Sequence, residues 1–380
     1  MRYRSLGKTG LKVSEIGLGG EWLERRSGEE VTEVIKHCEQ VGINILDCFM
    51  SEPKVRSHIG EALKGHREKW IIQGHVGAIW ENEQYVKNRE MPKIKAAFED
   101  LLVRLKTDYI DIGMIHYVDQ PAEFEAMLKG EHMAYMQALK AEGKIRHIGI
   151  STHNAFVAKA AALSGVVEVI MLSVNPAFDR ISATEDYQDL LKVLETESLE
   201  KMSPERRELY QICECEGVGI TVMKGYAGGR LLDGKVSPFK KALTPIQCIH
   251  YALTRPAVAS VLVGCQETDQ VDAAVAYETA TDEEKDYADF LASVSDEVAT
   301  GQCTYCGHCA PCPEAIDIAM VNKLYDLATM QEEVPATVKG HYRDLAKNAE
   351  DCIACGGCME RCPFGVDVID RMTKAAALFK

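Results

Sequence analysis

The chain lacks a long apolar run and lacks an excess of basic residues. None of its apolar stretches approaches the roughly 20 residues that a helix needs to span a bilayer. With 58 acidic and 43 basic residues, its formal net charge is −15, which argues against nucleic-acid partners and anionic membranes. The opening residues 1–13 are polar and lack the apolar segment of a secretory signal. These absences predict a cytoplasmic protein, with no nucleic-acid or membrane partner, whose thiols stay reduced.

Cysteine, in contrast, is abundant, because the chain has 14 cysteines and eight of them stand in two short runs. One run closes with Cys312-Pro313 and the other with Cys362-Pro363. This spacing is typical of the cubane iron–sulfur clusters of ferredoxins. The eight predicted ligands are Cys303, Cys306, Cys309, Cys312, Cys352, Cys355, Cys358 and Cys362. The sequence therefore predicts two [4Fe–4S] clusters and one-electron redox chemistry.

Structural zinc and disulfides are the alternative uses of these cysteines. Zinc usually draws two ligands from each of two separated pairs, and disulfides are rare in a reducing compartment, so both are disfavoured. In two-cluster ferredoxins the last cysteine of each run binds the cluster of the other run. We expect the same exchange here, although the first run has two residues before its last cysteine where the ferredoxin run has three. The expected ligand sets are Cys303, Cys306, Cys309 with Cys362, and Cys352, Cys355, Cys358 with Cys312.

Over residues 1–280, short apolar runs typical of strands alternate with amphipathic helical segments. Eight such βα units predict an α/β fold, a (β/α)8 TIM barrel. A doubly wound open sheet is the alternative, but the turn Gly17–Trp22 lacks the third glycine of the dinucleotide-binding motif. The opening segment is expected to form a short hairpin outside the barrel. The predicted strands are Glu15–Gly19, Ile43–Asp47, Trp70–Gly74, Tyr109–Ile115, His147–Ser151, Val169–Ser173, Gly219–Lys224 and Ala259–Gly264.

Residues 281–380 are predicted to form a second, α-helical domain that resembles a dicluster ferredoxin and holds both cysteine runs. A linker helix is expected over Thr281–Glu297, and the charged stretch Asp179–Glu200 is expected to be an excursion or lid of the barrel. The other predicted helices of this domain are Asp317–Gln331, Lys339–Ala349 and Asp367–Phe379.

Several segments, in their order and spacing, resemble the aldo-keto reductase family. They are Tyr3–Leu11, Gly42–Asp47, Ile59–Leu63, Thr107–Asp111 and Gly143–Ser151. With the cysteine-rich tail, the whole chain resembles the iron–sulfur subgroup of that family. The resemblance implies a (β/α)8 barrel that transfers hydride between NADPH and a carbonyl. It also implies an Asp, a Tyr, a Lys and a His at the top of the barrel.

Two of these four positions differ in this chain. Asp47 and His116 match the family aspartate and histidine, whereas Glu52 stands at the tyrosine position and His75 at the lysine position. Because histidine titrates near neutrality, Glu52 and His75 are predicted to replace the missing pair in acid–base catalysis. Histidine and carboxylate side chains also suit a divalent metal. A helix cap is the alternative role of Glu52.

Tyr117 and Tyr226 stand in nearby loops and are alternative proton donors. The resemblance also points to a cofactor site, in which serine and asparagine would hold a nicotinamide and a glycine-rich loop with two cations would approach a phosphate. The predicted cofactor-binding residues are Ser151, Asn175, Lys224, Gly228 and Arg230.

The loop after the last predicted strand is acidic, since it carries Glu267 and Asp269, and these carboxylates would repel a 2′-phosphate. NADPH specificity is therefore not expected. NADH, a flavin, a barrel-site metal or no second cofactor all stay open.

The leading hypothesis is an oxidoreductase of an anaerobic metabolism that acts on a small-molecule substrate, a carbonyl or an activated hydroxyl. Its clusters would exchange electrons with a redox protein partner, and Asp47, Glu52, His75 and His116 would handle protons. A non-redox lyase, isomerase or hydratase with structural clusters is the second hypothesis. An electron carrier with a degenerate barrel is the third. The sequence does not indicate an oligomeric state.

Overall fold

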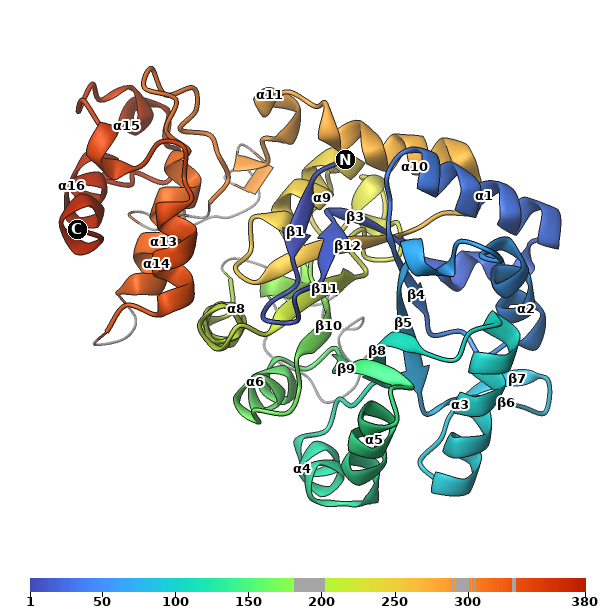
Figure 1. Cartoon of the computed structure of the whole chain (residues 1–380). Coiled ribbons are helices and arrows are strands. Elements are labelled where there is room, and N and C mark those ends of the chain that lie inside the picture. Colours follow the sequence, from blue (N-terminus) through green and yellow to red (C-terminus); the bar gives the residue numbers. More distant parts are fainter. Residues whose placement is uncertain (181–201, 289, 292–300, 302, 304, 330–332) are drawn as a thin grey trace.

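The computed structural model describes residues 1–180, 202–288, 290–291, 301, 303, 305–329 and 333–380. Among these residues, eight parallel strands close into a barrel in the order β10-β11-β12-β3-β4-β5-β8-β9 (Figure 1). The (β/α)8 barrel is therefore confirmed, and the open sheet is excluded, because the two outer strands of an open sheet would not pair. The barrel strands are β3 (Ile16–Gly19), β4 (Ile45–Cys48), β5 (Ile71–Val76), β8 (Ile110–Ile115), β9 (Ile145–Thr152), β10 (Val169–Ser173), β11 (Gly219–Met223) and β12 (Val258–Gly264).

An amino-terminal hairpin closes one end of the barrel, as expected. Strands β1 (Tyr3–Ser5) and β2 (Lys12–Ser14) pair antiparallel outside the barrel sheet. Next to them, Leu6 and Val13 are fully buried and belong to the apolar cluster that fills the barrel interior. Because apolar side chains plug this end, the carboxyl ends of the strands form the open mouth.

Helices surround the barrel, and each buries one apolar stripe against the sheet or its neighbours. Helix α1, for example, begins with a capping box between Ser27 and Glu30 and buries Val31, Val34 and Ile35 at helical spacing. Within the described part of the chain, none of the helices is long and apolar enough to cross a membrane. The surrounding helices are α1 (Gly28–Gln40), α2 (Pro53–Ala62), α3 (Met91–Leu105), α4 (Pro121–Lys129), α5 (Glu131–Ala141), α6 (Ala155–Leu163), α8 (Pro204–Glu216), α9 (Pro245–Leu253) and α10 (Thr268–Val275).

A second hairpin, which the sequence reading did not predict, follows β5. Its strands are β6 (Ala78–Glu81) and β7 (Gln84–Lys87), and they pair antiparallel. Asn82 and Glu83 form the two-residue connection with φ values of 52° and 58°, the left-handed pair that a tight hairpin turn requires. The hairpin carries Tyr85 to the barrel mouth. The predicted excursion Asp179–Glu200 lies almost wholly outside the described residues.

The cysteine-rich region is helical, and its two halves follow one plan. Asp317 caps α13 (Ile318–Ala328) and Asp367 caps α16 (Val368–Leu378), each five residues after the last cysteine of a run. These two helices pack together. Between them lie α14 (Ala336–Arg343), which begins three residues before its prediction, and the short α15 (Gly357–Arg361). Of the predicted linker helix, the structure describes α11 (Asp282–Lys285) as its first turn.

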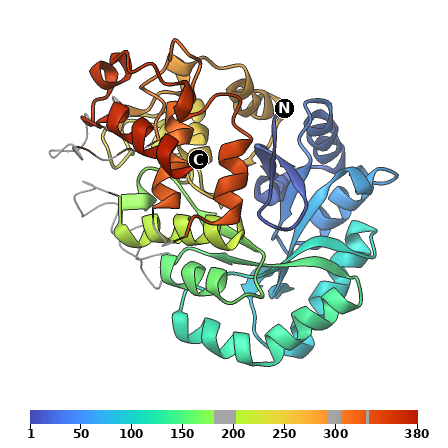
Figure 2. The same ribbon diagram turned by 60° about the vertical axis from the view of Figure 1, so that its left-hand side comes forward.

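The cysteine-rich region lies beside the barrel, with α13 and α14 against α8 (Figures 1 and 2). His341 of α14 forms an ion pair with Glu214 of α8 at 2.8 Å. Lys323 of α13, a buried cation, donates to the backbone carbonyl of Arg255 at 3.3 Å. These polar contacts fix the position of the cysteine runs relative to the barrel wall.

Candidate active site at the barrel mouth

A cavity of about 1040 Å³ opens at the carboxyl ends of the barrel strands. Residues at or just after the ends of β3, β4, β5, β8, β9, β11 and β12 line it, and the β6–β7 hairpin covers part of its rim. Active sites of (β/α)8 barrels lie at this face. Three of the four predicted catalytic residues, Asp47, His75 and His116, line the cavity.

These three residues form a hydrogen-bonded line across neighbouring strands. Asp47 is the second-last residue of β4, His75 stands in β5 and His116 directly follows β8. Asp47 Oδ1 lies 3.0 Å from His75 Nε2, and His75 Nδ1 lies 2.8 Å from His116 Nδ1. All three side chains are buried, with relative exposures of 2–3%. Gln73 holds the far end, since its Nε2 donates to Asp47 Oδ1 at 3.1 Å.

A tyrosine from the unpredicted hairpin extends the line into the cavity. The hydroxyl of Tyr85 is hydrogen-bonded to Nε2 of His116, and both residues line the cavity. Phe49 stacks on the His116 ring with 6.0 Å between the ring centroids and 7° between the planes. The sequence reading missed Tyr85, because it follows β5 by a hairpin and not by a helix. The two short apolar runs on either side of Asn82-Glu83, Ala78–Trp80 and Tyr85–Val86, were the available signal.

Burial keeps His116 and Tyr85, the two residues at the cavity end of this line, uncharged at neutral pH. Burial, and then the neighbouring His75, lower the pKa of His116 well below its ordinary value. Burial is also the main cause that raises the pKa of Tyr85, so its phenol keeps its proton at neutral pH. Both rings can therefore pass protons without either starting as an ion.

With Asp47 ionised, one arrangement of protons satisfies every bond in the line. The carboxylate accepts from His75 Nε2–H, so His75 Nδ1 is an acceptor and His116 Nδ1–H donates to it. His116 Nε2 is then an acceptor, and the Tyr85 hydroxyl donates to it. The phenol oxygen keeps its lone pairs for a molecule in the cavity. The line can therefore conduct a proton between the cavity and Asp47.

Glu52 lies apart from this line. Its carboxylate accepts from the backbone N–H of Val55 at 2.6 Å and so caps the start of α2. It is not among the residues that line the cavity. The two alternative proton donors, Tyr117 and Tyr226, both line the cavity. The centroid of the Tyr117 ring lies 5.1 Å from that of the His116 ring.

The predicted cofactor-binding residues divide into two groups. Ser151, Lys224 and Gly228 line the cavity, whereas Asn175 and Arg230 are not among its lining residues. Asn175 instead holds the loop that follows β11, because its Nδ2 donates to the backbone carbonyl of Lys224 at 2.9 Å. Lys224 has a φ of 58°, a left-handed conformation that is uncommon for a non-glycine residue. Burial lowers the pKa of Lys224 to about 8, so it carries a positive charge at neutral pH.

A second acid–histidine pair, also missed from the sequence, stands in the cavity wall. His153 Nδ1 lies 2.8 Å from Asp119 Oδ2, and the backbone N–H of His153 donates to Asp119 Oδ1 at 2.7 Å. Burial alone would raise the pKa of Asp119, but these hydrogen bonds outweigh it and lower the pKa. Asp119 is therefore a carboxylate, and it holds His153 in one orientation at the mouth.

The acidic loop after β12 receives a cation from elsewhere in the chain. Arg26 directly follows the short 3-10 helix Gly20–Arg25, which comes after β3. Its Nη2 donates to Gln266 at 2.6 Å and to Glu267 at 3.0 Å. The loop is acidic in its own sequence, but the fold brings one arginine next to it. A guanidinium already paired with carboxylates is nevertheless only partly available to a phosphate.

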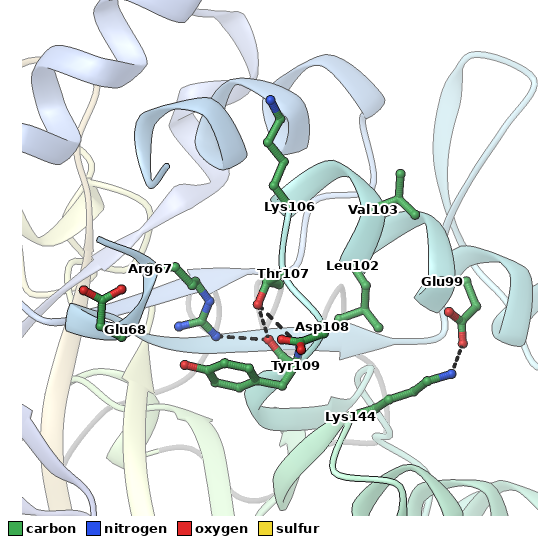
Figure 3. A pocket seen from close by; sticks show the side chains of 10 residues that line it. All are labelled: Arg67, Glu68, Glu99, Leu102, Val103, Lys106, Thr107, Asp108, Tyr109 and Lys144. Carbon is green, nitrogen blue, oxygen red and sulfur yellow. Dashed lines mark hydrogen bonds and ion pairs between the residues drawn. The ribbon is translucent and has the colours of Figure 1, made fainter. Parts of the chain in front are cut away.

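A second hollow, of about 640 Å³, lies at the opposite end of β8 (Figure 3). Two of its charged residues form an ion pair, with Lys144 Nζ 2.6 Å from Glu99 Oε1, and the Arg67 guanidinium lies 4.5 Å from the centroid of the Tyr109 ring. Contacts at the amino-terminal face of such a barrel usually serve stability. The hollow therefore carries no proton-transfer groups comparable to those of the mouth.

The cysteines of the second run are arranged as the predicted ligand exchange requires. Cys312 of the first run lines one pocket together with Cys352, Cys355 and Cys358. No three metal-binding side chains among the described residues converge on a single point. That is compatible with a cubane, because its four thiolates bind four separate corners. Thiolate donors in this set fit a [4Fe–4S] cluster.

Backbone contacts bring the end of the second run to the first run. Gly301 N–H donates to the carbonyl of Phe364 at 2.7 Å, so the segments next to Cys303 and Cys362 lie side by side. Arg361 Nη2 donates to the carbonyl of Cys309 at 2.6 Å. These contacts bring the segment that carries Cys362 next to the first run, and the exchange of ligands between the runs stays a prediction.

Comparison with known proteins agrees with both parts of the chain. The model of the aldo/keto reductase family matches residues 15–245, and the model of a 4Fe-4S dicluster domain matches residues 302–367. An uncharacterized oxidoreductase of Bacillus subtilis, YqkF, is 27% identical over 283 residues, which are 71% of this chain and 89% of the relative. The NADH-specific methylglyoxal reductase of Escherichia coli is 30% identical over 164 residues, 40% of this chain and 50% of the relative.

Among solved structures, the holo form of the aldo-keto reductase AKR11C1 from Bacillus halodurans superposes with a TM-score of 0.60 and 25% identity. The superposition covers 78% of this chain and 97% of that protein. The family model covers more than half of the sequence and coincides with the barrel, and the dicluster model coincides with the cysteine runs. The chain belongs to the aldo/keto reductase family and is an oxidoreductase of that family with a 4Fe-4S dicluster domain.

Proposed function

We propose that this chain reduces the carbonyl group of a small molecule, or oxidises the corresponding alcohol, with electrons that pass singly through its dicluster domain. The observation that carries the proposal is the line Asp47–His75–His116–Tyr85, which ends in a large cavity at the barrel mouth. Bound clusters supply one electron each, so a fully reduced pair holds the two electrons that the reaction consumes.

The reaction balances with these groups. Reducing a carbonyl breaks its π bond and forms one C–H and one O–H bond, at the cost of two electrons and two protons. For reduction the line starts with Asp47 protonated and its hydrogen bonds reversed: Tyr85 gives its proton to the carbonyl oxygen and takes one from His116 Nε2–H. His116 is reprotonated by His75, and His75 by Asp47, which ends as a carboxylate. The second proton comes from water. The reverse sequence takes a hydroxyl proton to Asp47 during alcohol oxidation.

Two features support the clusters as the electron source in place of a nicotinamide. Asn175 and Arg230, which the resemblance assigns to nucleotide binding, are not among the cavity-lining residues. The cation nearest the loop after β12, Arg26, is already paired with Glu267. We therefore expect a one-electron donor to sustain turnover better than NADH or NADPH.

The test is an anaerobic assay with methylglyoxal as the carbonyl probe, chosen because a relative is named for reducing it. Reduced methyl viologen, NADH and NADPH are compared as donors. We expect viologen-dependent reduction that is lost in Cys306→Ser, and retained in Cys215→Ser, a half-buried cysteine of α8 outside the runs.

Two outcomes would contradict the proposal. Equal NADH-dependent activity in the intact protein and in Cys306→Ser would make the chain a nicotinamide reductase. Conversion of a substrate that is independent of every donor would favour a lyase, isomerase or hydratase, for which the two imidazoles are also suited.

A further inference from the structure

The two cysteine runs face different surroundings. Cys306 of the first run and Cys358 of the second run are equally buried, at 8% exposure each, so the difference between the runs lies in their neighbours. Gly307, which follows Cys306, lies against α9, because a Cβ built on it would stand 3.8 Å from His250 Nε2. His308 forms an ion pair with Asp286, just after α11. The first run is therefore enclosed between its own helices and the barrel wall.

The second run faces outward. Cys355 is exposed, and its neighbours Ile353 and Met359 are 59% and 38% exposed. The pocket that gathers the second-run thiols is lined by residues between Cys312 and Met372 only, so it has no barrel residue in its wall. A cluster held there would lie near solvent and away from the mouth.

Charged and aromatic side chains fill the wall next to the first run. Arg255 Nη2 donates to the hydroxyl of Tyr287 at 3.0 Å, and its guanidinium lies 5.7 Å from the Tyr305 ring, between Cys303 and Cys306 in sequence. The Tyr287 ring lies 5.8 Å from the His250 ring, and a Cβ on Gly307, the neighbour of Cys306, would lie 3.8 Å from His250 Nε2. Tyr287 is therefore separated from the first run by one side chain.

From Tyr287 a continuous chain of contacts leads to the cavity. The Tyr287 ring lies 5.2 Å from the Tyr251 ring, and Tyr251 donates to Asp179 Oδ2 at 2.8 Å. Asp179 lies 3.9 Å from Arg206, which donates to the carbonyl of His153 at 3.3 Å. His153 lines the cavity. Every member of this chain is buried.

We propose that the two clusters act in a fixed order. The cluster of the second run exchanges electrons with a one-electron donor protein at the surface. The cluster of the first run exchanges them with the barrel across the wall formed by Arg255, Tyr287 and Tyr251. Cys352, Cys355 and Cys358 would hold the outer cluster, and Cys303, Cys306 and Cys309 the inner one, so electrons would arrive singly at the outer site and enter the cavity from the inner site. The order rests on the proposed function, but its tests do not need turnover.

The first test locates each cluster relative to solvent. Electron paramagnetic resonance of the dithionite-reduced protein is recorded with and without an aqueous dysprosium chelate, which broadens the signals of nearby exposed centres. Cys306→Ser and Cys355→Ser assign the two signals. We expect strong broadening of the signal changed in Cys355→Ser and little broadening of the signal changed in Cys306→Ser. Equal or reversed broadening would overturn the order, whether or not the protein reduces carbonyls.

The second test asks whether the wall acts on the inner cluster alone. A nearby cation favours the reduced, more negative state of a cluster, so Arg255→Met should move the potential of the inner cluster to a more negative value. The matched control is Arg343→Met, which removes an exposed guanidinium of α14. Potentials are measured by redox titration followed by electron paramagnetic resonance.

Tyr287→Phe covers the case in which Arg255→Met does not fold, because it keeps the ring and removes only the hydroxyl that Arg255 binds. It should alter the inner potential and leave the outer potential unchanged. Equal shifts of both potentials, or a shift of the outer one alone, would contradict the proposed order. A failure of carbonyl reduction with these results intact would count against the proposed function only.

Discussion

At the scale of residues, the site keeps two family positions and reaches a proton relay by a different route. In the family a lysine lowers the pKa of the catalytic tyrosine. Here His75 stands at the lysine position, and the tyrosine is Tyr85, from a hairpin outside the family motif. Burial raises the pKa of Tyr85, so it keeps its proton at neutral pH, and under the proposed function we expect it to exchange protons through His116 as a neutral phenol.

This relay makes Tyr85→Phe the most informative single change. Loss of the hydroxyl removes the last member of the relay, and general acid–base catalysis of this kind contributes roughly 10²- to 10⁴-fold to rate. We expect kcat to fall by about that factor, with KM changed little, in the anaerobic methylglyoxal assay. Tyr135→Phe, a partly buried tyrosine of α5 remote from the cavity, is the matched control. Activity within a few-fold of wild type would move the proton donor to Tyr117.

The fate of Glu52 shows why a motif position can mislead. By sequence offset it occupies the tyrosine position, but the chain enters α2 immediately after it with Pro53. The first backbone N–H groups of a helix have no partner within the helix, and the N–H of Val55 donates to the Glu52 carboxylate. Alignment with a family motif predicts the position of a residue along the chain. It does not predict which local donor competes for the side chain.

At the scale of elements, the period of the apolar residues was sufficient to find every barrel strand. All eight described barrel strands overlap a predicted one, since buried parallel strands are short, apolar and separated by helices. The hairpin β6–β7 escaped because its strands are only four residues long and its turn is Asn82-Glu83, not the usual Asn-Gly. The site depends on that hairpin, so the sequence predicted three of its four members.

Two glycines in helices offer a paired test of element packing. A Cβ on Gly60 of α2 would lie 2.0 Å from the carbonyl oxygen of Arg104 in α3, whereas a Cβ on Gly340 of α14 meets nothing within 4 Å. Gly60→Ala must therefore force the two helices apart, at a cost of about 1–3 kcal/mol or more. Gly340→Ala should instead stabilise the chain by about 0.5–1 kcal/mol, because alanine favours the helix.

Thermal unfolding of the two variants checks this prediction. Opposite shifts of the melting temperature are expected, with the larger shift for Gly60→Ala. Equal shifts would mean that helices α2 and α3 do not pack as closely as their backbone contact indicates.

At the scale of the whole molecule, the electron path requires that the cysteine-rich region keep its place on the barrel. The described contacts that hold it are an apolar cluster that both parts share and a set of polar contacts around Glu214. Lys323 and His341 both act on Glu214 at the end of α8, and Glu214 also accepts from the backbone N–H of Ala257 at 2.6 Å. A polar joint of this kind orients the two parts and makes their attachment depend on pH.

The titration of this joint predicts a pH window of greatest stability. The hydrogen bond to Glu214 raises the pKa of His341 above its ordinary 6.5. Its stabilising contribution is therefore complete below about pH 6.5 and is lost as the pH rises through the raised value. Burial would raise the pKa of Glu214, but His341 and Lys323 outweigh it and lower the pKa from 4.5 to about 2. That contribution is complete above about pH 4.5 and disappears toward pH 2.

Both contributions are present together between about pH 4.5 and 6.5. Thermal unfolding of the cluster-loaded protein, followed by the loss of cluster absorbance, should show its highest midpoint there and a decline toward pH 8.5. His341→Gln should flatten the alkaline decline, because the titrating group is gone. His37→Gln, which removes a histidine–aspartate pair within the barrel, should leave the decline in place. If His341→Gln kept the full alkaline decline, another group would control the attachment, and the joint at Glu214 would only position the two parts.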